Sequence, residues 1–226
     1  MYFVGREKEI GQIKEALEGG NNVIISGKYG IGRTSLIKHI ADAMKDQWRF
    51  VFADFSKTPG SVCNYLLAEL FPTQEFDREY VRYKPSRFRI VTLALEDHRE
   101  HVLVLDNVSK LSAQKLDLIR YLTWEHRFQF VSIVESFLPQ GDLFRLRVWM
   151  NPSSLIKLHY LSASDVVRFF QQLSKEHQLG WSEGQIRNLA EVTGGYPLRM
   201  QEIALRKLER KRQLQEVSVA HIISAR

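Results

Sequence analysis

The stretch VIISGKYGIGRTSL, residues 23–36, joins an apolar strand to the start of a helix through a glycine-rich turn. The pattern G-x-x-x-x-G-K-[ST] is typical of phosphate-binding loops, in which backbone N–H groups cradle phosphates, Lys reaches the β/γ-phosphates and the hydroxyl holds Mg²⁺. Gly27 and Gly32 have this spacing and Thr34 stands at the Mg²⁺ position, but Arg33 replaces the Lys. The stretch therefore predicts nucleotide binding without guaranteeing hydrolysis, and an ordinary strand–turn–helix is the alternative.

A second pattern lies at HVLVLDN, residues 101–107, where an apolar run ends in an acid. A buried parallel strand reads as a continuous apolar run, and its carboxyl end faces the ligand crevice of an open α/β sheet. We therefore expect Asp106 to share a Mg²⁺ with Thr34. The next residue is Asn107, an amide that can orient water but cannot accept a proton at neutral pH. A core strand that ends in an Asp-Asn turn is the alternative.

The rest of the chain alternates between strand and helix patterns as far as residue 158 and is helical from Ser162 onward. This order predicts a P-loop NTPase-like parallel sheet flanked by helices, an α/β base over residues 1–160, followed by a small all-α lid over 161–226. We expect residues 71–86 to be an insertion or loop. The expected strands are 23–25, 50–55, 101–107, 128–135 and 154–158; the expected helices are 5–17, 35–44, 61–70, 90–96, 111–122, 162–177, 182–192, 198–212 and 217–225.

Composition narrows the class of protein only broadly. The 226 residues carry a net charge of +6 and a pI near 9.4, which weakly favours acidic partners such as DNA. No apolar run approaches the roughly 20 residues of a membrane span, and the N-terminus lacks a signal-peptide pattern. A single cysteine, Cys63, excludes an internal disulfide and fits a cytoplasmic location, and its apolar surroundings predict a core residue.

In the order of its motifs the chain resembles the AAA+ ATPases, within them the initiator and transposition-helper group and the related STAND signalling ATPases. The resemblance covers nearly the whole chain: FVGREKEI (3–10) as the N-terminal box, the loop and HVLVLDN as Walker A and Walker B, VSIVESF (131–137) as sensor 1, and TGGYPLRMQEIAL (193–205) as sensor 2. It implies binding of ATP and Mg²⁺. The nucleotide-binding residues it implies are Val4, Gly5, Arg6, Gly27, Lys28, Tyr29, Gly30, Ile31, Gly32, Arg33, Thr34, Ser35, Pro197 and Arg199.

The resemblance also implies self-association or assembly with another AAA+-like subunit, in which an arginine from one subunit completes the site of the next. Arg145 and Arg147, shortly before the last expected strand, match this position. An Arg on a γ-phosphate stabilises the charge of the transition state. The alternative is that both are solvated surface charges.

Two departures concern catalysis. Arg33 is planar and longer than Lys, so it is not a conservative change at a tight phosphate site. Asn107 removes the expected base, and Glu135 at the end of the neighbouring strand is a candidate to replace it. Two main functions stay open. One is an ATP-dependent assembly switch that recruits or regulates a partner, with DNA as one candidate surface and with weak or absent hydrolysis; the other is a catalytically inactive nucleotide-binding scaffold in a larger complex. A DNA-binding helper that needs no nucleotide is a third alternative, supported only by the pI.

Overall fold

The computed structural model describes residues 3–72, 83–94, 100–124 and 127–224. They fall into two compact units. The α/β unit comprises Glu7–Tyr29 and Arg33–Leu158. The helical unit comprises the chain up to Arg6, Gly30–Gly32 and the chain from His159 onward.

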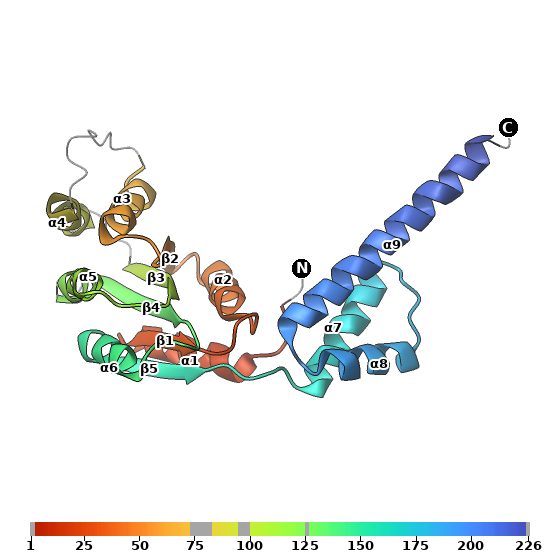
Figure 1. The fold of residues 1–226 in the computed structure, drawn as a ribbon, viewed down its shortest axis with the longest axis horizontal. Helices are drawn as coiled ribbons and strands as arrows, with labels where there is room; N and C mark the ends of the chain where they lie inside the picture. Colours follow the sequence, from red (N-terminus) through yellow and green to blue (C-terminus); the bar gives the residue numbers. More distant parts are fainter. Residues whose placement is uncertain (1–2, 73–82, 95–99, 125–126, 225–226) are drawn as a thin grey trace. The chain divides into compact units, whose positions relative to one another are not determined.

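The α/β unit alternates strands and helices along the chain (Figure 1). Its elements are α1 (Glu7–Glu18), β1 (Asn22–Ser26), α2 (Arg33–Ala43), β2 (Trp48–Asp54), α3 (Pro59–Leu70), α4 (Tyr83–Ala94), β3 (Glu100–Val108), α5 (Ala113–Trp124), β4 (Phe128–Val134), α6 (Gln140–Trp149) and β5 (Ser153–Lys157). The strands form one parallel sheet in the order β2-β3-β4-β1-β5. The predicted fold class, a P-loop NTPase-like α/β sheet flanked by helices, is confirmed.

The register places the ends of β2 and β3 together. Asp54 pairs with Asp106 across these two strands, and the Phe55 N–H donates to the Asp106 carbonyl at 2.7 Å. On the other side of β3, β4 ends at Val134, and β4 itself lies beside β1. Because all strands run the same way, the loops that follow β1, β2, β3 and β4 gather at one edge of the sheet.

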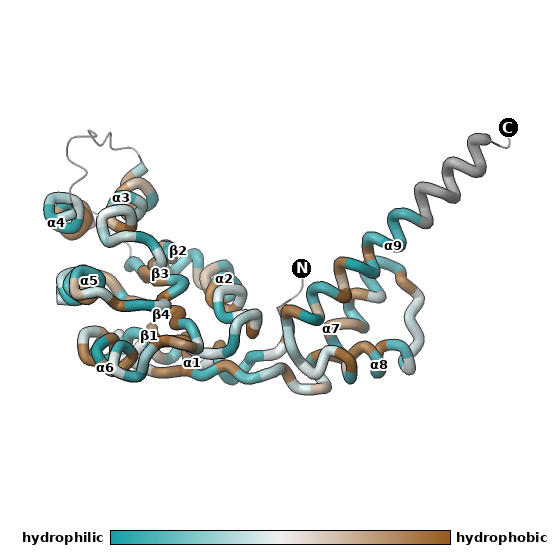
Figure 2. Tube along the Cα trace, in the orientation of Figure 1, coloured by the Kyte–Doolittle hydropathy of each residue, from teal (hydrophilic) through white to brown (hydrophobic). Residues whose placement is uncertain are grey.

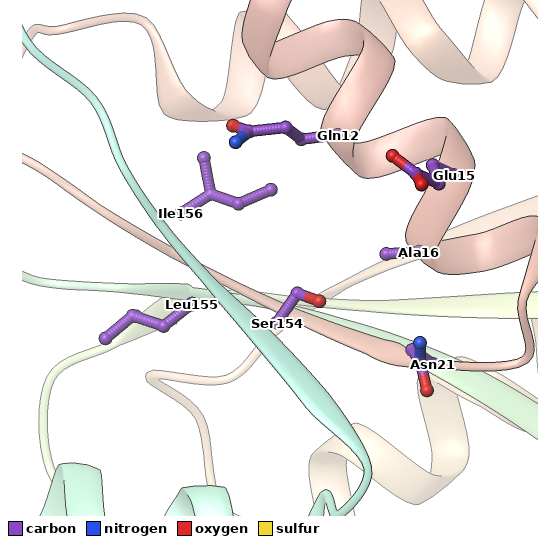
Figure 3. Close-up of a pocket in the computed structure, with 7 residues that line it drawn as sticks. All are labelled: Gln12, Glu15, Ala16, Asn21, Ser154, Leu155 and Ile156. Atoms are coloured by element: carbon purple, nitrogen blue, oxygen red, sulfur yellow. The ribbon is translucent and has the colours of Figure 1, made fainter.

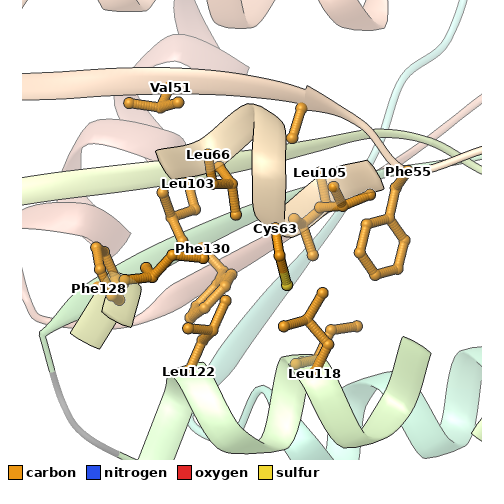
Figure 4. Packing of buried hydrophobic residues seen from close by; sticks show 14 of the residues in the cluster. Val51, Phe55, Cys63, Leu66, Leu103, Leu105, Leu118, Leu122, Phe128 and Phe130 are labelled. Atoms are coloured by element: carbon orange, nitrogen blue, oxygen red, sulfur yellow. The ribbon is translucent and has the colours of Figure 1, made fainter. Parts of the chain in front are cut away.

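The core lies on both faces of the sheet. The middle of β1 is hydrophobic (Figure 2), and Val23, Ile24 and Ile25 are fully buried. One large cluster joins the sheet to α3, α4, α5 and α6, and Figure 4 shows Cys63 within it beside Leu105, Leu118 and Phe130. Burial raises the pKa of the Cys63 thiol to about 12, so the thiol stays neutral. The predicted core role of Cys63 is confirmed.

The helical unit consists of α7 (Ala163–Glu176), α8 (Glu183–Thr193) and α9 (Pro197–Ser224) around its own apolar cluster. Ser162 and Ser182 cap α7 and α8 by accepting from backbone N–H groups. Gly194 ends α8 in the left-handed conformation. At Gly195, with φ +74°, a Cβ would lie 2.2 Å from the Leu161 carbonyl oxygen, so this position requires glycine.

Three sequence predictions about these elements were wrong. Residues 83–86 belong to α4 rather than to a loop. Pro85 is tolerated there because it lies in the first turn, where a helix needs no backbone N–H donor. Residues 73–82 of the expected loop lie outside the described part. Helix α6 was missed because it buries only Asp142 and Leu146 and so has little periodicity. The expected separate helices 198–212 and 217–225 fall on one helix, α9, which runs as far as Ser224, since neither Gly nor Pro interrupts the sequence after Pro197. Residues 95–96 of the expected helix 90–96 and residue 225 lie outside the described part.

Other boundaries agree with prediction to within about two residues, as is usual for helix and strand ends. In the part of the chain that the structure describes, no helix combines the length and apolar character needed to cross a bilayer.

Candidate nucleotide site

The glycine-rich loop runs from the end of β1 to the first residue of α2. Gly32 has φ +90°, and a Cβ built there meets no atom within 4 Å, so open space lies over this residue. Gly30, with φ +70°, is different: a Cβ there would lie 2.6 Å from the Tyr196 hydroxyl and 2.9 Å from Leu198. The loop thus uses one glycine to pack closely and another to leave its backbone open, as a phosphate requires.

Arg33 points away from solvent and is held by the end of β4. Its guanidinium donates to both carboxylate oxygens of Glu135, at 2.9 and 2.8 Å, and also to the Val134 carbonyl. Arg33 is only 7% exposed and Glu135 13%. Both carboxylate oxygens accept from one nitrogen, Nη2, while Nη1 donates to the carbonyl, and a charge-assisted contact with such burial is strong. Glu135, the candidate replacement base, is therefore engaged with the residue that stands at the Walker Lys position.

Thr34 and Asp106 lie together, as the loop and strand motifs predict. The Thr34 hydroxyl lies 3.2 and 3.1 Å from the two carboxylate oxygens of Asp106 and donates to this group. A hydroxyl and a carboxylate are oxygen ligands of the kind that Mg²⁺ prefers. These two residues fit a loop-bound Mg²⁺. Position 33 is where a cation is expected to contact the phosphates. Arg33 fits this role less well, because Glu135 already neutralises its charge.

Asn107 connects this group to β2. It has φ +60°, a left-handed conformation that Asn tolerates better than most residues, and its backbone N–H donates to Asp106 Oδ1 at 2.8 Å. Its side-chain amide donates to Asp54 Oδ1 at 3.2 Å. The Ser56 hydrogen bonds outweigh burial, and together with those from Asn107 and the charge of Lys57 they lower the pKa of Asp54. A second carboxylate thus stands at the edge of the sheet, ionised at neutral pH.

Sequence reasoning missed Asp54 and also Lys115. The Lys115 ammonium lies over the Phe55 ring and donates to the Phe55 carbonyl at 2.6 Å, which ties α5 to the end of β2. Burial lowers the pKa of Lys115, partly offset by the charge of Asp54. The acid that follows the β2 run was a visible signal for Asp54. Nothing in the local sequence marks Lys115.

The remaining predicted residues are divided between the two units. In the α/β unit Lys28, Tyr29 and Ser35 are exposed and Gly27 is buried. In the helical unit Ile31 is buried, Val4 packs on the apolar cluster, Pro197 begins α9 and Arg199 is exposed. Gly5 has φ +68°, and a Cβ there would press on Asp165. The Arg6 guanidinium donates to the carbonyls of Ile31, at 3.3 Å, and His159.

The two candidate assembly arginines lie on α6. Arg145 forms an ion pair with Asp142 one turn earlier, and Asp142 Oδ2 also accepts from the Leu111 N–H at 3.2 Å. Arg147 is exposed on the same helix. Arg145 therefore has a structural contact on its own subunit, and of the two Arg147 is the better candidate for a contact with a neighbour.

A pocket of about 440 Å³ lies elsewhere on the α/β unit (Figure 3). Its lining comes from α1, from Asn21 and from the outer strand β5, and includes Gln12, Glu15 and Ser154. None of the loop residues lines it, so it is not part of the candidate site.

Comparison with known proteins identifies the family of this chain. The model of the AAA ATPase domain family matches residues 2–134, well over half of the sequence. The chain therefore belongs to the AAA ATPase domain family, within the AAA+ P-loop ATPases, and the predicted family is confirmed. A comparison with curated protein sequences gives no match.

Three solved structures illustrate the shared fold. Orc1 of Aeropyrum pernix in complex with DNA has a TM-score of 0.67 at 15% identity, over 94% of this chain and 62% of that one. Cdc6p of Pyrobaculum aerophilum also has a TM-score of 0.67, at 16% identity over 93% and 62%. The Holliday junction branch migration motor RuvB of Thermotoga maritima has 0.57, at 15% identity over 96% and 64%. This chain thus spans somewhat under two thirds of each of these proteins.

Proposed function

We propose that this chain is an ATP-binding AAA+ module that works as a nucleotide-dependent assembly switch and recruits or regulates a partner, with weak or absent hydrolysis. In this proposal residues 1–160 form the nucleotide-binding base and residues 161–226 the lid. The choice of ATP over GTP rests on the family. Thr34 and Asp106 would hold the Mg²⁺, which screens phosphate charge when bound.

One observation carries the proposal: the ion pair of Arg33 with Glu135, in which Nη2 contacts both carboxylate oxygens. It leaves the open backbone over Gly32 and the Thr34–Asp106 pair in place, so the parts that bind nucleotide are retained. At the same time the ion pair occupies both Arg33 and Glu135, so neither the cation nor the candidate base is available to accelerate hydrolysis. Asn107 adds to this because an amide is no general base.

The role of assembly rests on the family and on the exposed Arg147 of α6. A DNA surface is supported by the net charge of +6 and by the DNA in the Orc1 structure from A. pernix. The second candidate function is a scaffold subunit that binds nucleotide without switching. The pairing of Arg33 with Glu135 is consistent with this function too.

Light scattering separates the two. The mass of the protein is measured at tens of micromolar without nucleotide, with Mg-ADP and with Mg-ATP, each with and without duplex DNA, and ATP turnover is measured in parallel. The switch predicts a rise in mass with nucleotide and turnover far below about 1 s⁻¹. A monomer under all conditions favours the scaffold, and turnover of about 1 s⁻¹ or more contradicts the proposed loss of catalysis.

A further inference from the structure

The position of Arg33 bears on whether the site distinguishes a nucleoside triphosphate from a diphosphate. In a phosphate-binding loop the backbone N–H groups cradle the α- and β-phosphates, whereas the cation after the last glycine reaches the β- and γ-phosphates. The first set of contacts depends on Gly27–Gly32 and the start of α2. Within the loop, the direct side-chain contact to the β- and γ-phosphates falls to the residue after the last glycine, which here is Arg33.

The charge of Arg33 is already used within the protein. Its guanidinium contacts both oxygens of Glu135 and the Val134 carbonyl, and the pair is buried, with Arg33 7% and Glu135 13% exposed. The guanidinium is planar and presents its donors as a rigid fork, so Nη2, which binds Glu135, and Nη1, which binds the Val134 carbonyl, cannot turn to a phosphate without giving up these contacts.

The carboxylate itself also opposes a γ-phosphate. A γ-phosphate that approached Arg33 would bring further negative charge towards Glu135, and this repulsion offsets the attraction to the guanidinium. The α- and β-phosphates keep the backbone donors and the positive end of α2, which do not involve Glu135. The contacts shared by diphosphate and triphosphate thus remain, while those specific to the triphosphate are weakened.

From this arrangement we propose that Glu135 is a specificity-determining residue: by holding Arg33 it makes the nucleotide site of the single chain almost indifferent to the γ-phosphate. The site then takes nucleoside diphosphates and triphosphates with about equal affinity. This inference rests on the proposed nucleotide binding. It also implies that any preference of an assembly for the triphosphate comes from a neighbouring subunit.

Titration calorimetry with the full chain tests the proposal, using Mg-ADP and the Mg complex of a non-hydrolysable ATP analogue. In the wild type the two affinities are expected to agree within about threefold. In Glu135→Gln the neutral amide no longer competes for the guanidinium, and the triphosphate is expected to bind about tenfold or more tightly than the diphosphate. Adding Arg33→Met to Glu135→Gln is expected to remove that gain.

Asp117→Asn is the matched control. Asp117 also accepts from arginines, Arg87 and Arg120, on helices away from the loop, so its substitution removes a carboxylate from an arginine pair without touching the site. Its ratio of affinities is expected to equal that of the wild type. Any loss of stability common to both variants is thereby separated from specificity.

Three outcomes overturn the proposal. A wild-type preference of tenfold or more for the triphosphate shows that the γ-phosphate is read despite Glu135. An unchanged ratio in Glu135→Gln shows that this residue does not set the specificity. In both cases binding itself is intact and the proposed function stands; binding of neither nucleotide to the wild type and to Glu135→Gln overturns the proposed function together with this inference.

Discussion

The Asn107 side-chain amide donates to Asp54 Oδ1 at 3.2 Å, so an amide on β3 and an acid on β2 form a pair at the carboxyl edge of the sheet. The register places Asp54 opposite Asp106, the residue before Asn107. An acid introduced at position 107 would therefore meet a carboxylate rather than an empty site. Restoring the acid that normally follows the Walker B Asp requires a change at both positions.

Asn107→Glu alone is expected to destabilise the protein by about 1–2 kcal/mol, because it sets like charges side by side and places Glu in a left-handed conformation. The exchange of the two residues, Asn107→Glu with Asp54→Asn, is expected to recover part of this loss. Urea unfolding of the three proteins measures both effects. An exchange that is no more stable than the single variant would contradict the pairing.

The same exchange has a consequence for hydrolysis. When Arg33→Lys is added to it, the site regains both groups that the sequence lacks, and turnover is expected to rise about tenfold or more over the wild type. Steady-state phosphate release measures the rate, with Arg33→Lys alone as the control. Equal rates in the triple variant and the wild type would show that these losses do not limit hydrolysis.

The Thr34–Asp106 pair predicts how binding depends on Mg²⁺. Thr34→Ala is expected to reduce the gain in nucleotide affinity on adding Mg²⁺ by about tenfold, while affinity in EDTA stays near that of the wild type. Calorimetry with and without Mg²⁺ measures this gain. Thr92→Ala is the control, since the Thr92 hydroxyl donates to the Phe88 carbonyl of its own helix, α4. A full Mg²⁺ response in Thr34→Ala would place the metal elsewhere.

Arg147 predicts a separation of assembly from binding. Arg147→Ala is expected to weaken nucleotide-dependent self-association and to leave nucleotide affinity of the single chain nearly unchanged, because the exposed side chain is free to act towards a neighbour rather than within its own loop. Light scattering and calorimetry measure the two properties. Arg206→Ala, an exposed arginine of α9, is the control. Assembly that is as strong in Arg147→Ala as in Arg206→Ala would exclude this role for Arg147.

Part of this site could be predicted from the sequence because its signals are local. The loop after β1, Thr34, and the acid at the end of β3 each follow from a short pattern of residues. The Arg33–Glu135 pair could not be predicted, because its partners are 102 positions apart and their meeting depends on β4 lying beside β1. The Asp54–Asn107 pair likewise depends on the register between β2 and β3.

In the fold, too, elements with a local sequence signal were predicted and elements without one were not. Helices with a clear apolar side, such as α7, were predicted, whereas α6 was missed because little of it is buried. The break expected before residue 217 was wrong, since polar residues with good helix propensity continue α9 without interruption.

Asp117 predicts an acid-sensitive contribution to stability. Burial raises its pKa, but hydrogen bonds from Arg120, Tyr83 and Arg87 outweigh this, and the pKa lies below its ordinary value of 3.8. A carboxyl group with a lowered pKa stabilises the fold above about pH 4, and this stabilisation is lost as the pH falls through the pKa of the folded state. The stability difference between wild type and Asp117→Asn is therefore expected to shrink between about pH 6 and about pH 3. Urea midpoints measure it, and a difference that is constant or larger at low pH would contradict this.

Calorimetric titration of Mg-ADP into three proteins tests most directly whether the glycine-rich loop binds adenine nucleotide. Gly32→Val fills the open space over the loop. Gly20→Val is the matched control, because Gly20 also has a positive φ, +74°, and no atom within 4 Å of a built Cβ, but lies in the turn after α1. We predict saturable one-to-one binding to the wild type and to Gly20→Val, and none to Gly32→Val. No binding to the wild type, or equal binding to both variants, would contradict nucleotide binding at this loop.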